Sequence, residues 1–188
     1  KARLAEELRQ RRFRRVKVSV VTLPDSDEGR SLPFVLDRLD EAAAQGSDLV
    51  CLPMECVKTA GEPIPGPLSD ALAAKAKATH MYVVANLRER DGEQTYITSC
   101  LLGRDGQVLG KYRKSHKLPD EAFALGDDLP VFNTDFGKIA MKIGSDRYFP
   151  EIDWVYAAKG ARLILWSQER EPVEDEYLQD FPQEGRAQ

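Results

Sequence analysis

Hydrophobic and polar positions along the chain follow two different periods, one typical of helices and the other of strands. Apolar residues three to four positions apart, or an alanine-rich composition, predict helices at three places: residues 32–45, 68–80 and about 150–159. Alternating or continuous runs of β-branched and apolar residues predict strands elsewhere: residues 16–23, 48–53, 81–90, 131–134, 138–144 and 161–166. Gly46 and Gly160 stand where a left-handed residue ends the first and third helices.

Two Asp-Gly pairs, at residues 91–92 and 105–106, are flanked by β-type residues. Asp-Gly is a strong signal for a tight hairpin turn, so residues 81–113 are predicted to form two successive hairpins. The whole order of elements contains no repeat and no break between domains. It is typical of a sheet-rich α/β domain with helices on the faces of its sheets.

Length and charge limit the partners that we expect. The chain has 188 residues, of which 42% are hydrophobic, and no apolar run approaches the roughly 18 residues that a membrane-spanning helix needs. Its 31 acidic residues exceed its 27 basic residues, which gives a net charge of -4, and a negative balance repels a phosphate backbone. We therefore expect neither nucleic acid nor a membrane as a partner.

The two ends of the chain are oppositely charged. Residues 1–15 hold seven Lys or Arg and two Glu, and are predicted to form a basic surface helix; binding to an anionic membrane or to a partner is the weaker alternative. Residues 169–188 hold seven Asp or Glu and two Arg. We therefore divide the chain into a basic helix at 1–15, a folded domain at 16–168 and an acidic segment at 169–188.

The cysteines and histidines do not indicate a metal site. Cys51, Cys56 and Cys100 are odd in number and lack metal-type spacing, which favours free thiols in a reducing compartment, the cytoplasm. Cys56 and Cys100 are interpreted as small buried hydrophobic residues. His80 and His116 are the only histidines, too few for a good metal site.

Four segments occur in an order that is recognisable as a whole: DLVCLP at 48–53, DGQVLGKYRKSHKLPDE at 105–121, FGKIAMKIGSDRYFPE at 136–151 and KGARLILW at 159–166. From about residue 16 to residue 166 the chain resembles the nitrilase superfamily of carbon–nitrogen hydrolases. The resemblance implies a four-layer α-β-β-α sandwich. Because the family's domain extends further, the C-terminal part is expected to be missing and the chain to be a fragment of a longer protein.

The resemblance also implies a reaction. A Glu-Lys-Cys triad would hydrolyse non-peptide carbon–nitrogen bonds of small amides, nitriles or carbamoyl compounds. In such a triad a thiolate attacks the carbon, the glutamate moves protons and the lysine stabilises the oxyanion, so no metal or organic cofactor is required. Association into homo-oligomers is a further expectation from the resemblance.

The triad carries over to this chain only in part. Lys114 matches the family's lysine, and Glu121 matches a second acidic residue of that site. The family's cysteine stands two residues before the Asp of its Asp-x-x-Phe-Pro-Glu segment, and this chain has Gly144 there, which leaves the position without a nucleophile. Met54 occupies the place of the first glutamate. Glu55 follows it, and would reach the same pocket only if the backbone bulged.

Three interpretations stay open at this point. The chain could be an active amidase with an unusual nucleophile, supplied by Ser145, Cys56 or the missing C-terminal part. Ser145 is a weak candidate because a hydroxyl needs a well-placed base. It could be a non-catalytic homologue that binds a small ligand or a protein partner. Alternatively, Gly144 or Met54 could be a mutation or a sequence error in an ordinary enzyme. We favour the absence of efficient catalysis, since the attacking group is missing.

Overall fold

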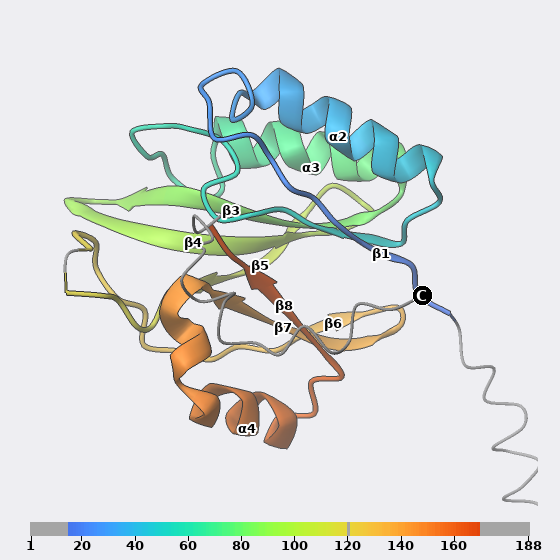
Figure 1. Cartoon of the computed structure of the whole chain (residues 1–188). Helices are drawn as coiled ribbons and strands as arrows, with labels where there is room; N and C mark the ends of the chain where they lie inside the picture. The colour runs from blue at the N-terminus through green and yellow to red at the C-terminus, as the bar shows by residue number, and fades with distance from the viewer. Residues whose placement is uncertain (1–14, 120, 170–188) are drawn as a thin grey trace, which may run out of the picture.

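The computed structural model describes residues 15–119 and 121–169. Two β-sheets face each other, and helices cover the outer face of each sheet (Figure 1). This arrangement confirms the four-layer α-β-β-α sandwich expected from the sequence. The predicted basic helix at 1–15 and the acidic segment at 169–188 lie almost entirely outside the described residues.

The larger sheet has the strand order β1-β2-β3-β4-β5. Its strands have the following bounds: β1 Val18–Val20, β2 Leu49–Cys51, β3 Tyr82–Asp91, β4 Gln94–Leu102 and β5 Val108–Arg113. The first three strands are parallel, as expected for strands that are joined through helices. β3, β4 and β5 are antiparallel, which confirms the two hairpins predicted from the Asp-Gly pairs.

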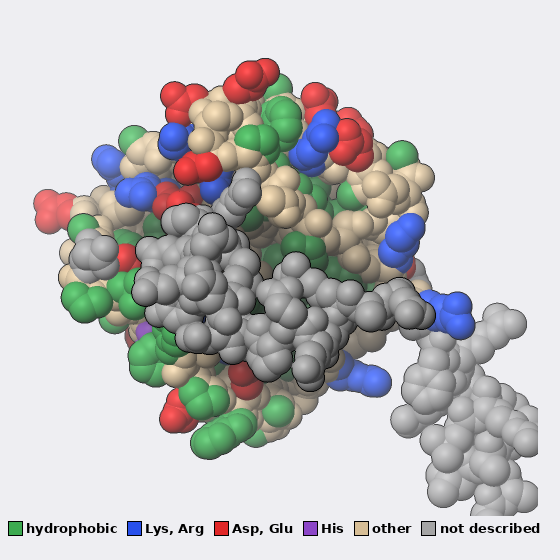
Figure 2. Space-filling model, in the orientation of Figure 1, with side chains coloured by type: hydrophobic (Ala, Val, Ile, Leu, Met, Phe, Trp, Pro, Cys, Tyr) green, Lys and Arg blue, Asp and Glu red, His purple; other side chains and the backbone are tan. Residues whose placement is uncertain are grey.

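The smaller sheet has the order β6-β7-β8, formed by Phe132–Thr134, Gly137–Ile143 and Leu163–Ser167. Helix α4, Pro150–Ala158, links β7 to β8 and packs on this sheet through Ile152 and Tyr156. A short 3-10 turn, η1 at Gly144–Tyr148, precedes α4 and was not expected from the sequence pattern. Large apolar side chains stay exposed on η1 and α4, and green side chains gather over this part of the molecule in Figure 2: Tyr148, Phe149, Trp154 and Val155.

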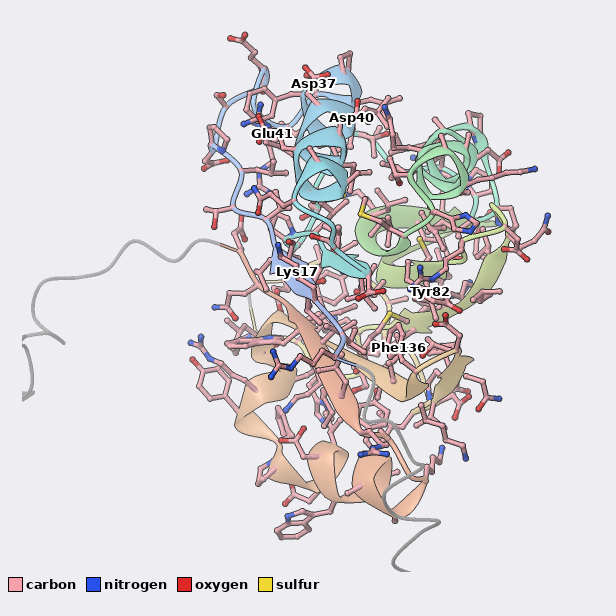
Figure 3. The ribbon with its side chains drawn as sticks, turned by 90° about the vertical axis from the view of Figure 1, so that its right-hand side faces the viewer. Lys17, Asp37, Asp40, Glu41, Tyr82 and Phe136 are labelled. Carbon is pink, nitrogen blue, oxygen red and sulfur yellow. The ribbon has the colours of Figure 1, made fainter. Side chains whose placement is uncertain are left out.

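Helices α2, Leu32–Ala44, and α3, Pro67–Thr79, cover the outer face of the larger sheet (Figure 1). Both begin with a proline in the first turn, where its missing N–H costs nothing. The periodic apolar residues of α2 and α3 are buried with the outward side chains of β2 and β3 in one cluster. The charged side of α2 faces away from the sheets, as Figure 3 shows for Asp37, Asp40 and Glu41. No helix within the described residues is long and apolar enough to cross a membrane.

A second hydrophobic core fills the space between the two sheets. It includes Val84 and Leu101 of the larger sheet and Met141 of the smaller one, all fully buried. At one end of this core the rings of Tyr82 and Phe136 meet edge to face, with centroids 5.5 Å apart (Figure 3). Such aromatic pairs add to the free energy gained by burial, so this contact joins the turn between β6 and β7 to the larger sheet.

One carboxylate is buried in the larger sheet and is surrounded by donors. Glu89 on β3 is 1% exposed, and it accepts hydrogen bonds from Thr98 Oγ1 at 2.7 Å, from Arg113 Nε at 2.9 Å and from Lys111. Burial alone would raise the pKa of Glu89, but these hydrogen bonds outweigh it and hold the pKa at about 2. The charged form of Glu89 is therefore favoured in the folded state.

We expect Glu89→Gln to lower the free energy of unfolding at pH 7 by about 2 kcal/mol, because Lys111 and Arg113 lose their shared anion. The pKa of Glu89 is lower in the folded chain than its ordinary 4.5, so its contribution is present above that pH and is lost as the pH falls toward 2. Urea denaturation should show a difference in the free energy of unfolding between the two proteins, and this difference should disappear in acid. Glu93→Gln, in the exposed turn after β3, is the control. A difference in stability that stays constant down to pH 2 would contradict the stabilising role of the Glu89 carboxylate.

A second buried carboxylate, Asp146 in η1, ties the two sheets together. One of its oxygens accepts from Tyr112 Oη at 2.7 Å and from Ile143 N at 2.9 Å. The other accepts from His116 N at 3.1 Å and Ser115 Oγ at 3.3 Å. Burial, together with the charge of Asp146, raises the pKa of Tyr112, so its hydroxyl stays a donor. The end of β5 is thereby fixed relative to the end of β7.

Asp146→Asn should lower the free energy of unfolding by about 2 kcal/mol, because an amide can accept at only one of the two atoms that now accept. Asp37→Asn, on the exposed side of α2, removes the same charge and should change stability by less than about 0.5 kcal/mol. Denaturation of the two variants side by side measures the difference. Equal stabilities would show that Asp146 does not join the sheets.

Candidate active site

A cavity of about 370 Å³ opens where several strands of both sheets end. Met54 follows β2, Lys114 follows β5 and Gly144 follows β7. All three line the cavity, together with Glu121 and Ser145. Loops at the ends of strands are typical places for functional residues, because the sheet fixes them while their side chains stay accessible. The structure therefore brings together four of the five site residues expected from the sequence: Lys114, Glu121, Gly144 and Ser145.

Lys114 and Glu121 form a close ion pair at the cavity. Lys114 is 1% exposed, and its Nζ lies 2.5 Å from Glu121 Oε1. The other oxygen of Glu121 accepts from Leu118 N at 2.6 Å, so the carboxylate is held at both atoms. The backbone N of Lys114 donates to Ile97 O at 2.8 Å, which anchors the lysine to β4. A buried ammonium is stable when it is paired in this way, and it has two further N–H donors.

Gly144 faces the same cavity at the point where a side chain would enter it. A Cβ built on this residue would lie 3.3 Å from Lys114 Nζ and 3.4 Å from Met54 Sδ. Gly144 has φ +48°, a left-handed conformation that glycine adopts without the strain of other residues. Position 144 thus points between Lys114 and Met54 but presents no reactive atom.

Glu55 does not lie at the cavity, although it was included among the site residues on the condition of a backbone bulge. Its φ is +45°, and its N–H donates to Asn86 Oδ1 at 2.8 Å. This turn sends the side chain to Arg88, whose Nε donates to Glu55 Oε1 at 2.7 Å. Met54 instead presents its thioether to the cavity, and a thioether is not a base.

Ser145 lines the cavity, but its hydroxyl is engaged elsewhere. Ser145 Oγ donates to the backbone oxygen of His116 at 2.9 Å. The imidazole of His116 contacts Ser115 Oγ at 3.0 Å and Asp146 Oδ1 at 3.4 Å, and it stacks on Phe149. Within the described residues the hydroxyl of Ser145 makes no hydrogen bond to a carboxylate or an imidazole. The geometry does not activate Ser145 for attack.

The three cysteines are buried outside this cavity. Burial raises the pKa of Cys56 and of Cys100 to about 12, and that of Cys51 to about 11. Their thiols therefore stay protonated, and a protonated thiol is a poor nucleophile. This agrees with the interpretation of Cys56 and Cys100 as small buried residues. No group of three or more His, Cys, Asp or Glu suited to a metal occurs among the described residues.

Other residues of the cavity were missed in the sequence. Asp25, Tyr148, Gln168 and Glu169 also line it. Asp25 and Glu169 come from loops that follow β1 and β8, and loop residues of this kind carry no periodic signal in one sequence. Tyr148 alone has a sequence signal, because it lies in the DRYFPE segment at 146–151.

Comparison with known proteins identifies the fold and the family. Residues 17–184 match the family model described as carbon-nitrogen hydrolase. Saccharomyces cerevisiae Nit3, a member of branch 10 of the nitrilase superfamily, superposes with a TM-score of 0.76 at 23% identity, covering 86% of this chain and 67% of that chain. An amidase from Nesterenkonia sp. gives a TM-score of 0.73 at 23% identity, covering 88% and 69%.

Curated relatives agree with the structural comparison. Omega-amidase NIT2-B of Xenopus laevis is 30% identical over 149 residues, which cover 68% of this chain and 54% of the relative. Omega-amidase NIT2 of Danio rerio is 30% identical over 172 residues, which cover 80% of this chain and 60% of the relative. The chain thus spans somewhat more than half the length of these relatives. It belongs to the carbon–nitrogen hydrolase family of the nitrilase superfamily.

Proposed function

We propose that this chain binds small amides or related carbonyl compounds in the cavity at Lys114 and does not hydrolyse them efficiently. The observation that carries the proposal is the environment of Gly144. Its missing side chain would enter the cavity beside the buried ammonium, where the family's chemistry requires a nucleophile. The cavity is thus formed and charged, but without an attacking group.

The groups that remain are suited to binding a carbonyl group. The ammonium of Lys114 is oriented by Glu121 and can donate to a carbonyl oxygen with an N–H that Glu121 does not use. Such a donor is already in place when the ligand arrives, and Lys114 itself is buried. The carboxylate of Glu121 can also accept from an amide N–H of the ligand.

Two steps of hydrolysis lack their groups. A covalent intermediate needs a thiolate or an activated hydroxyl close to the carbonyl carbon, and Gly144 supplies neither. Proton transfer to the leaving nitrogen needs an acid or base within about 3 Å. The Sδ of Met54 cannot serve, and the carboxylate of Glu121 is held by Lys114 at one oxygen and by Leu118 N at the other. The amidase activity named for the relatives therefore does not transfer to this chain without new groups at positions 144 and 54.

The experiment combines binding with turnover. Small amides, nitriles and carbamoyl compounds are titrated into the 188-residue chain, and binding is followed by the chemical shifts of the protein. Ammonia release is assayed in the same samples. We expect saturable shifts and no ammonia above the background. Ammonia release that is absent in Lys114→Met but present in the unmodified chain would contradict the proposal, and so would the absence of binding by every compound.

The alternative with Ser145 as nucleophile is tested in the same assay. Ser145→Ala should leave ammonia release at background, as in the unmodified chain, because its hydroxyl is bound to the backbone of His116. Release that is measurable in the unmodified chain and abolished in Ser145→Ala would instead support hydrolysis through the serine.

Restoring the missing groups should restore chemistry in two steps. Gly144→Cys alone should give weak amide hydrolysis at most, because no base lies at position 54. Adding Met54→Glu should raise the rate by about 10² or more, a typical effect of a general base. Steady-state ammonia release measures both. Full amidase activity in the single variant, or no gain from the second change, would show that the base is not at position 54.

Reactivity of the new thiol gives a control that does not depend on turnover. A thiol at position 144 would stand beside the ammonium of Lys114, which should lower its pKa and speed alkylation by iodoacetamide at pH 7. The same substitution combined with Lys114→Met should react more slowly. Equal rates would show that position 144 does not face Lys114. Because Gly144 has φ +48°, we expect the substitution to lower the free energy of unfolding by about 1 kcal/mol.

A further inference from the structure

The charges that line the cavity are unbalanced. Three carboxylates line it, those of Asp25, Glu121 and Glu169, but Lys114 is the only basic residue among the described lining residues. The ammonium of Lys114 is already paired with Glu121 at 2.5 Å. The charges of this pair compensate one another, so the net charge of the described lining residues comes from Asp25 and Glu169.

These two carboxylates belong to the outer part of the cavity. The side chain of Asp25 is 72% exposed, and Glu169 is exposed as well, whereas Lys114 is buried. A ligand that reaches Lys114 with its carbonyl group would therefore extend its other end toward Asp25 and Glu169. This places the acidic groups where they contact the variable part of a ligand, not its amide.

Two arginines stand near the cavity without lining it. Arg30 is buried, and its Nε lies 3.9 Å from Asp25 Oδ1, while its Nη1 donates to the backbone oxygens of Met54 and Glu55. The guanidinium of Arg147 lies over the rings of Tyr148 and Trp166. Arg30, together with Lys58, whose charge also interacts with Asp25, offsets part of the charge of Asp25. Neither arginine nor Lys58 is among the described residues that line the cavity.

We propose that the cavity selects amides whose far end carries a positive charge, an inference that rests on the proposed amide-binding function. Asp25 and Glu169 are the residues that determine this selectivity. The ligand would place its amide at the Lys114–Glu121 pair and an ammonium group near the two carboxylates. An anionic end would meet the same carboxylates and be repelled.

The expected size of the effect follows from exposure. Because both carboxylates are in contact with water, each interaction is screened, and the cationic ligand should bind about tenfold more tightly than an anionic one at low ionic strength. The preference should shrink as salt is added, since the screening length falls to about 3 Å at 1 M salt.

Three amides of nearly equal length test the inference. In 4-aminobutanamide the far end is an ammonium, in pentanamide it is a methyl group, and in succinamate it is a carboxylate. Dissociation constants for the unmodified 188-residue chain are measured by NMR titration in 10 mM and 500 mM NaCl. We expect the order cationic, neutral, anionic at low salt, with the ratio of the outer two falling at high salt.

Variants locate the source of the preference. Asp25→Asn combined with Glu169→Gln should bring the ratio of cationic to anionic affinity close to one. Asp37→Asn removes a charge from the exposed side of α2, which faces away from the sheets (Figure 3). This variant should keep the full ratio.

The outcomes separate this inference from the function on which it rests. Equal affinities for the three amides, or tighter binding of succinamate, would overturn the cation preference while leaving amide binding intact. A ratio that survives in the double variant would overturn the assignment to Asp25 and Glu169. If none of the three amides binds, the proposed function itself fails, and the inference fails with it.

Discussion

The arrangement of the candidate site depends on the buried carboxylate of Asp146. Its two oxygens accept four hydrogen bonds, from the end of β5 and the residues after it on one side and from the end of β7 on the other. A buried carboxylate is tolerated only when its acceptors are satisfied, and here the donors come from both sheets. The positions of Lys114 and Gly144 relative to each other follow from this single group.

The geometry around Gly144 explains how a pocket can persist when a central reactive group is absent. The ion pair of Lys114 and Glu121 is supported by backbone contacts to Ile97 and Leu118, not by any side chain at position 144. Glycine also relieves the strain of the left-handed backbone there. The ion pair therefore does not need a side chain at position 144 for its stability, which is consistent with the proposed binding function.

Periodic and turn-forming residues predicted most of the fold. The Asp-Gly pairs at 91–92 and 105–106 correctly indicated both hairpins, and the apolar spacing in 32–45 indicated α2 to within one residue. The turn η1 was missed because its five residues are too few to show a period. The order of four sequence segments then indicated the family, and the family resemblance implied the four-layer sandwich. No local pattern could predict how the sheets and helices are layered.

The site was predictable only where a motif marks it. Lys114, Glu121, Gly144 and Ser145 lie in segments whose order is recognisable, and the structure places all four at one cavity. Glu55 shows the limit of this reasoning, since a positive φ and the attraction of Arg88 decide its direction, and neither is visible in one sequence. The same holds for Asp25, whose loop reaches the cavity only through the tertiary fold.

Amide binding without hydrolysis is tested most directly by observing the carbonyl carbon of a ligand. Pentanamide labelled with ¹³C at the carbonyl is incubated with the chain, and its ¹³C NMR signal is recorded over a day. We expect a signal that shifts or broadens on addition of the protein and is never replaced by the signal of pentanoate. Steady growth of the pentanoate signal would show that a nucleophile acts in this chain, and an unperturbed signal would show that the cavity binds no amide.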